Sequence, residues 1–138
     1  MTEMQIKSLL DAAVSAMERA YAPYSTFHVG AALLARDGRI FTGCNIENAS
    51  YPVTICAERA ALSSAVSAGL REFSAIAIVG GHHGKMEDIC TPCGICRQAL
   101  SEFCSPEMPV YLGKIDGYTT LTLGELLPHS FHLKEDLS

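Results

Sequence analysis

Two short segments of the chain carry side chains that can bind a metal ion and move protons. The first places Cys56, Glu58 and Arg59 where an apolar run begins, and the second contains Cys93 and Cys96 in a C-x-x-C spacing. A lone C-x-x-C pair fits a redox disulfide as well as half of a metal site. A third thiol favours zinc, because several cysteine thiolates together form a common zinc ligand set.

Both cysteine segments stand at predicted helix starts, and this position favours the thiolate that a metal binds. Helix N-termini carry partial positive charge, which lowers the pKa of a thiol. A catalytic zinc site keeps one coordination position for water, and a nearby carboxylate can take the proton of that water. Glu58 is the candidate for this role. It shares no helix face with Cys56 unless Cys56 lies at the tip of the helix.

Arg59 follows Cys56 by three residues and therefore lies on the same helix face. Zinc bound by three thiolates carries a net negative charge. We predict that the Arg59 guanidinium hydrogen-bonds to sulfur and offsets this charge.

The hydrophobic pattern predicts the elements that must bring these side chains together. In chain order we predict a helix over 6–17, a hairpin of strands over 27–35 and 39–46, a helix over 56–69, a strand over 73–80, a helix over 92–103, two strands in "MPVYLG" and "TTLTL", and a helical turn in "GELLP". Pro92 is expected to open the second cysteine helix. This order of elements predicts an α/β fold with helices on both faces of a sheet.

Length and composition restrict the class of protein. The 138 residues suit one domain over 1–138, and 49% hydrophobic with 18% charged residues is typical of a soluble globular protein. The net charge of −5 and the lack of a Lys/Arg cluster argue against a nucleic-acid partner. No apolar run reaches the roughly 18 residues of a membrane span, so we expect no membrane partner and a cytoplasmic protein. In that reducing compartment, six cysteines favour metal binding or catalysis over disulfides.

Several motifs together resemble a known family. An acid two residues after the first ligand, followed by P-C-x-x-C, is the signature of zinc-dependent nucleoside and base deaminases, and "CAER" followed by "PCGICRQ" resembles it. Within that superfamily the chain resembles the small cytidine deaminases, on the stretches "APYSTFHVGAAL", "GCNIENASY", "CAERAA" and "LLPHSF". These motifs extend from about residue 20 to 131.

The resemblance implies a fold, a cofactor and a reaction. It implies a three-layer α/β/α sandwich around a mixed five-stranded sheet, assembled as a homotetramer with shared active sites. One zinc ion per subunit is held by Cys56, Cys93 and Cys96. Zinc-bound hydroxide attacks C4 of cytidine or deoxycytidine while Glu58 shuttles protons, and ammonia and uridine or deoxyuridine are released, as in pyrimidine salvage.

The resemblance also implies roles for the residues that bind the nucleoside. Asn45 and Glu47 match the pair that hydrogen-bonds to the ribose hydroxyl, and Phe27 matches an aromatic residue that packs on the pyrimidine. The backbone of Ala57 matches a contact to the edge of the base. Phe131 matches an aromatic residue that reaches the ring from another subunit.

Other interpretations of these residues stay open at this point. Cys90, with "CTPCGIC", could supply three ligands of an iron–sulfur run. The chain could be a zinc-stabilised structural module, a redox protein, or a deaminase of aminoacyl-nucleoside antibiotics. Cys44 and Cys104 are expected to be small buried hydrophobic residues. His82 and His83 are expected in an exposed loop.

The candidate nucleoside-binding residues also have plainer interpretations. Phe27 lies in an apolar strand and could belong to the core, and Asn45 could satisfy a turn. Phe131 could be a tail residue that docks on its own subunit.

Overall fold

A mixed five-stranded sheet forms the middle layer of the protein. The computed structural model describes residues 1–86 and 89–133. The strands follow the spatial order β2-β1-β3-β4-β5, in which β3 and β4 are parallel and the other neighbours antiparallel. Their bounds are β1 Phe27–Ala35, β2 Ile40–Cys44, β3 Phe73–His82, β4 Pro109–Leu112 and β5 Thr119–Thr122.

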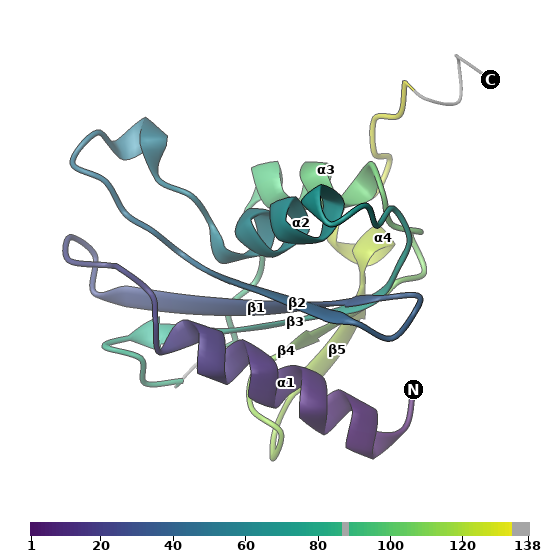
Figure 1. The fold of residues 1–138 in the computed structure, drawn as a ribbon, viewed down its shortest axis with the longest axis horizontal. Helices are drawn as coiled ribbons and strands as arrows, with labels where there is room; N and C mark the ends of the chain where they lie inside the picture. Colours follow the sequence, from purple (N-terminus) through teal and green to yellow (C-terminus); the bar gives the residue numbers. More distant parts are fainter. Residues whose placement is uncertain (87–88, 134–138) are drawn as a thin grey trace.

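Helices cover both faces of this sheet, which confirms the expected three-layer α/β/α architecture. Helix α1 (Glu3–Met17) lies on one face, and α2 (Ala57–Ser67), α3 (Gly94–Ser101) and α4 (Leu123–Leu126) lie on the other (Figure 1). A short 3-10 helix, Tyr51–Val53, interrupts the loop between β2 and α2. No helix in the described ranges combines the length and the apolar character needed to cross a bilayer.

The central strand β3 contributes to a separate hydrophobic core on each face. Its residues Ala75, Ala77 and Val79 pack in the core beneath α1, and Ile76 and Ile78 pack in the core beneath α2 and α3. Successive side chains of a strand point to opposite faces, so a strand that is covered on both sides is apolar throughout. This explains why the strand predicted over 73–80 is apolar along its length.

Two glycines allow helices to approach the sheet closely. A Cβ atom at Gly30 would lie 2.0 Å from the Ala13 carbonyl oxygen of α1, and one at Gly43 would lie 2.5 Å from the Ala57 carbonyl oxygen of α2. Real Cβ contacts are never this short. Gly43 therefore sets the height of the first turn of α2, which carries the first cysteine motif, above the sheet.

The two cysteine helices begin later than the sequence predicts. Cys56 (φ −78°, ψ 150°) and Cys93 (φ −70°, ψ 168°) have extended backbones, so they are the N-cap residues of α2 and α3. Pro92 precedes this cap and does not open the helix, which corrects the prediction. At the other end of α2, Gly69 has a φ of 95°, as expected for a C-terminal glycine.

Some strand bounds also differ from the prediction. Strand β2 ends at Cys44 and not at residue 46, whereas β3 continues past residue 80 to His82. The extension arises because β3 pairs with β1 along its whole length, down to the pair of His82 with Phe27. His82 is exposed, as expected, but belongs to a strand and not to a loop.

Candidate active site

The N-terminal ends of α2 and α3 bring three cysteine side chains together. The Sγ atoms of Cys56 and Cys93 are 3.9 Å apart, those of Cys93 and Cys96 are 3.5 Å apart, and all three lie within 4.8 Å of one another. Zinc–sulfur bonds of about 2.3 Å at tetrahedral angles separate the sulfurs by about 3.8 Å. Two of the sulfur separations are therefore close to those of zinc ligands, and the three thiols fit a zinc ion.

This cluster contains three ligand residues and no fourth His, Cys, Asp or Glu within residues 1–86 and 89–133. Cys90 is not a member, so the "CTPCGIC" segment does not supply three ligands by itself. A closed structural zinc site would require four protein ligands. The arrangement matches a zinc site with a coordination position left for water.

The backbone around the ligands is held in place independently of a metal. Neither Cys56 nor Cys93 caps its own helix with its side chain, so both sulfurs are directed to the cluster. Arg97 donates from Nε to the Pro92 carbonyl at 2.7 Å and from Nη1 to the Leu126 carbonyl at 2.7 Å. These bonds tie the segment before Cys93 to α4.

Arg59 lies beside the sulfur atoms, as the spacing predicts. Its Nη2 atom is 3.6 Å from the Sγ atom of Cys56. Hydrogen bonds from the Cys96 thiol and then from Arg59 lower the pKa of Cys56 from 9.0 to about 5. The hydrogen bond with Cys56 in turn raises the pKa of Cys96, so Cys56 ionises first. The guanidinium thus stabilises negative charge on the cluster.

Glu58 is a buried carboxyl group next to the same thiols. It is only 4% exposed. Burial raises its pKa from 4.5 to about 7, and the negative charge of Cys56 contributes to the increase. Because Cys56 is the N-cap residue, its side chain projects past the end of the helix, and a residue two positions later can approach it. Glu58 can therefore act beside Cys56 although residues two positions apart do not share a helix face.

Glu47 and Asn45 lie where β2 ends and are held by hydrogen bonds to the segment before β1. The Glu47 carboxylate accepts from the backbone N–H groups of Tyr24 (2.9 Å) and Ser25 (3.1 Å) and from the Ser25 hydroxyl. The Ser25 hydroxyl is the main cause of the lowered pKa of Glu47. Glu47 is therefore an ionised acceptor.

The Asn45 side chain is buried and is bonded to β1 through both of its polar atoms. Its Oδ1 accepts from the Val29 N–H at 2.8 Å, and its Nδ2 donates to the Phe27 carbonyl at 2.8 Å. Asn45 thus joins the strand that starts with Phe27 to the loop that carries Glu47, and does more than satisfy a turn.

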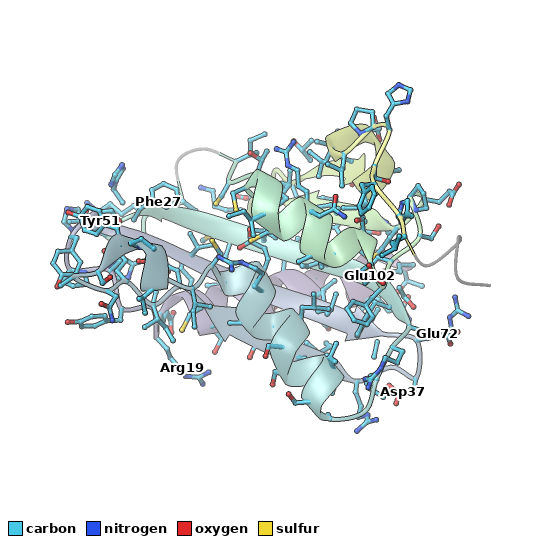
Figure 2. All side chains as sticks on the ribbon, turned by 90° about the horizontal axis from the view of Figure 1, so that it is seen from above. Arg19, Phe27, Asp37, Tyr51, Glu72 and Glu102 are labelled. Atoms are coloured by element: carbon cyan, nitrogen blue, oxygen red, sulfur yellow. The ribbon has the colours of Figure 1, made fainter. Side chains whose placement is uncertain are left out.

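A cavity of about 400 Å³ adjoins Glu47. It is lined by Tyr24, Ser25, Glu47, Asn48, Tyr51 and Thr54. The rings of Tyr24 and Tyr51 meet edge to face with centroids 6.2 Å apart. Figure 2 shows Phe27 and Tyr51 at the same end of the molecule, away from Asp37 and Glu72. The predicted nucleoside-binding residues of this region therefore share one end of the sheet.

Phe27 and Ala57 occupy positions that differ in exposure. The half-buried Phe27 begins β1, and its ring lies beside Gly80, where an added Cβ would be 3.2 Å from Phe27 Cε2. Ala57 is fully buried and is the first residue of α2, directly between Cys56 and Glu58.

Phe131 is not buried against its own subunit. The side chain is 70% exposed, and only its backbone is fixed, by a hydrogen bond from Gln98 Nε2 to the Phe131 carbonyl at 3.0 Å. This contact places the segment after α4 beside α3 (Figure 1).

The remaining cysteines lie outside the cluster. Cys104 is buried, and burial raises the pKa of its thiol to about 12, as expected for a small hydrophobic residue. Cys44 is only half-buried. Burial also raises the pKa of Cys90 to about 12, and an added Cβ at Gly80 would meet its sulfur at 3.1 Å.

Sequence reasoning missed two residues that contact the site. Ser25 lies within the quoted motif "APYSTFHVGAAL" but received no role, although a hydroxyl next to a tight turn was a signal for a carboxylate partner. The sequence predicts His82 in a loop, and no sequence pattern indicates that its ring meets that of Phe27, with the ring centroids 5.1 Å apart.

Comparisons with known proteins agree with this geometry. The family model described as "Cytidine and deoxycytidylate deaminase zinc-binding region" matches residues 3–112. A cytidine deaminase of Sporosarcina psychrophila is 50% identical over 136 residues, which cover 98% of this chain and 96% of that protein. A cytidine deaminase of Halalkalibacterium halodurans is 47% identical over 129 residues, which cover 93% of this chain and 95% of that protein.

Solved structures give the same result. The crystal structure of cytidine deaminase from Burkholderia pseudomallei matches with a TM-score of 0.83 and 47% identity, and the match covers 95% of this chain and 100% of that chain. Zinc is the cofactor that the family model and the three-cysteine cluster both support. The chain belongs to the cytidine and deoxycytidylate deaminase family of zinc-dependent enzymes.

Proposed function

We propose that this protein hydrolyses cytidine and deoxycytidine to uridine and deoxyuridine, with release of ammonia. The observation that carries this proposal is the buried Glu58 carboxyl, with a pKa raised to about 7, beside three thiols that fit zinc. The similarity to proteins named cytidine deaminases supports cytidine as the substrate.

Glu58 is proposed to move the protons of the reaction. When bound, zinc supplies the acidity that produces a hydroxide nucleophile for C4 near neutral pH. Glu58 accepts one proton of the attacking water and delivers it to N3 of the cytosine ring. It then takes the second proton of that water from the new C4 hydroxyl group and gives it to the leaving amino group, so that ammonia departs as the C4 carbonyl forms. A carboxyl group whose pKa lies near the working pH can both accept and donate a proton.

The nucleoside is proposed to bind across the end of the sheet where Phe27 and Tyr51 lie. Glu47, ionised and already oriented by Ser25, accepts a hydrogen bond from a ribose hydroxyl, with Asn45 beside it. Phe27 packs on the pyrimidine, and the backbone of Ala57 contacts the edge of the base. Free cytosine lacks the ribose and would lose the hydrogen bonds to these residues, so the site would discriminate against it.

We also infer a homotetramer with shared active sites, because the exposed Phe131 ring can act only where another surface receives it. A role in pyrimidine salvage, a cytoplasmic location and a single domain over 1–138 stay predictions from the sequence.

The proposal is tested by mixing the purified protein with cytidine, deoxycytidine, free cytosine and an aminoacyl-nucleoside antibiotic. Ultraviolet absorbance and released ammonia are followed, and zinc is measured on the same preparation. We expect ammonia from the two nucleosides in equal amount to uridine or deoxyuridine. Zinc without ammonia from any substrate would indicate a structural module, and the lack of stoichiometric zinc would indicate a redox protein.

A further inference from the structure

The residue before β1 has a strained backbone next to the Phe27 ring. Thr26 has a φ of 62°, in the left-handed region, and His83, whose N–H donates to the Thr26 carbonyl, has a φ of 56°. A β-branched residue rarely adopts this conformation. Such strain persists only where the surrounding structure enforces it, and it concentrates at functional sites.

Three hydrogen bonds hold Thr26 in this conformation. Its N–H donates to the Ala22 carbonyl at 3.0 Å, and its carbonyl accepts from the His83 N–H at 2.6 Å. Its hydroxyl lies 3.1 Å from Nδ1 of His82. Two of these contacts come from the end of β3, so this strand end and the segment before β1 are joined around Thr26.

The same arrangement confines the ring of Phe27. His82 is the partner of Phe27 in the β1–β3 register, and the two rings meet edge to face, with centroids 5.1 Å apart and planes at 87°. The ring also lies against Gly80, where an added Cβ atom would be only 3.2 Å from Phe27 Cε2. A histidine ring and a glycine backbone therefore bound it.

The backbone of Phe27 is already fixed by other residues of the site. Its N–H donates to the Ser25 hydroxyl at 3.0 Å, and its carbonyl accepts from Asn45 Nδ2 at 2.8 Å. What remains free is the rotation of the side chain, and the ring of His82 restricts that rotation.

We propose that His82, at the strand end that is joined to Thr26, is a positioning residue whose ring fixes the Phe27 ring for contact with the pyrimidine. This inference rests on the proposed function, because the contact between Phe27 and the base is part of it. His82 acts through Phe27 and does not take part in proton transfer.

Two variants separate the ring of His82 from its polar atom. His82→Asn keeps a polar group near Thr26 but removes the ring, whereas His82→Phe keeps the ring and removes the polar group. Loss of an edge-to-face pair predicts that His82→Asn raises KM for cytidine about twofold to tenfold, with kcat nearly unchanged. His82→Phe should restore most of the wild-type KM.

His83→Asn is the matched control. It removes an exposed histidine ring from the same segment but keeps the backbone N–H that donates to the Thr26 carbonyl. In a Phe27→Ala background, His82→Asn should have no further effect on KM. A wild-type KM for His82→Asn, or an equal increase in both backgrounds, would overturn the proposal.

A readout without turnover separates this inference from the proposed function. In protein with 13C-labelled phenylalanine, the flip rate of the Phe27 ring should increase in His82→Asn and stay near wild type in His82→Phe. An unchanged flip rate in His82→Asn contradicts the positioning role. If the wild-type protein releases no ammonia from cytidine, the proposed function is contradicted. The flip rate of the Phe27 ring then still decides whether His82 positions that ring.

Discussion

At the scale of single residues, the Glu47 carboxylate shows how the fold prepares an acceptor before any ligand arrives. Three donors, all from Tyr24 and Ser25, bind its two oxygens. The Ser25 hydroxyl lowers the pKa of Glu47 below its ordinary value of 4.5. A carboxylate that stays ionised at acidic pH keeps its affinity for a sugar hydroxyl there.

Ser25→Ala is predicted to raise the pKa of Glu47 toward 4.5, because the main hydrogen bond to the ionised form is lost. A lowered pKa in the folded state stabilises the protein above the unfolded-state pKa, and this stabilisation is lost as pH falls through the folded-state pKa. Because Glu47 binds the sugar hydroxyl best when it is ionised, the rise in KM at acidic pH should begin at a higher pH in Ser25→Ala than in the wild-type protein. Carboxyl 13C NMR of Glu47 measures the pKa directly.

Ser105→Ala is the control for this prediction. The Ser105 hydroxyl also donates to a carboxylate, that of Glu107, and lowers its pKa, but neither residue belongs to the candidate site. The control should shift the pKa of Glu107 without changing the pH dependence of KM. An unchanged Glu47 pKa in Ser25→Ala would contradict the role given to the hydroxyl.

At the scale of elements, the site depends on the close approach of α2 to β2. Gly43→Ala would place a Cβ 2.5 Å from both the Ala57 carbonyl oxygen and the Ala61 nitrogen, which belong to helix backbone and cannot turn away. The helix must shift, and Cys56 and Glu58 shift with it. We expect a loss of about 1–3 kcal/mol in the free energy of unfolding and weaker zinc binding.

Urea unfolding and a zinc titration of the Gly43→Ala protein measure these two effects. Gly117→Ala is the matched control, because an added Cβ there meets nothing within 4 Å. Wild-type zinc affinity in Gly43→Ala would show that the height of α2 does not position the ligands.

Much of this fold could be predicted because its elements have clear local signals. The apolar run over 73–80 identifies a strand covered on both faces, and Gly69 marks the end of α2. The starts of α2 and α3 could not be placed, because Cys56 and Cys93 act as N-caps without side-chain hydrogen bonds. No propensity indicates a cap whose side chain is directed to a metal.

The site was predictable to the extent that spacing and resemblance identify it. The C-x-x-C pair and the earlier cysteine motif predict the cluster that the structure assembles. The contact of His82 with Phe27 depends on the pairing of β1 with β3 and on a left-handed Thr26, and neither can be read from residue types. The turn that contains Ser25 indicates a partner for its hydroxyl but does not identify Glu47 as that partner.

At the scale of the whole molecule, the exposed Phe131 ring raises the question of what receives it. Its backbone is fixed by Gln98, one residue after Arg97, which ties the segment before Cys93 to α4. The backbone at Phe131 is therefore held in place on its own subunit, whereas the aromatic ring of Phe131 is exposed. This arrangement is what donation to a neighbouring subunit requires.

Mixed oligomers test that donation. Phe131→Ala should raise KM for cytidine by about twofold to tenfold without unfolding the subunit, because an aromatic contact is lost. When Phe131→Ala is reassembled with Glu58→Gln, intact Phe131 rings from the second protein complete sites that still have Glu58. The mixture should therefore show a component with the wild-type KM.

Two results would contradict shared active sites. A KM that stays at the Phe131→Ala value in every mixture would show that the ring acts within its own subunit. Sedimentation that gives a monomer for the wild-type protein would exclude the homotetramer.

The most direct test of the central claim is the zinc content and the cytidine turnover of the Glu58→Gln protein, measured on one preparation. We predict one zinc ion per subunit and an unchanged fold, with kcat lower by about 10²- to 10⁴-fold, since the three thiols remain and only the proton carrier is lost. Turnover near the wild-type rate, or loss of zinc from the variant, would contradict the role of Glu58 as the group that moves protons beside the metal.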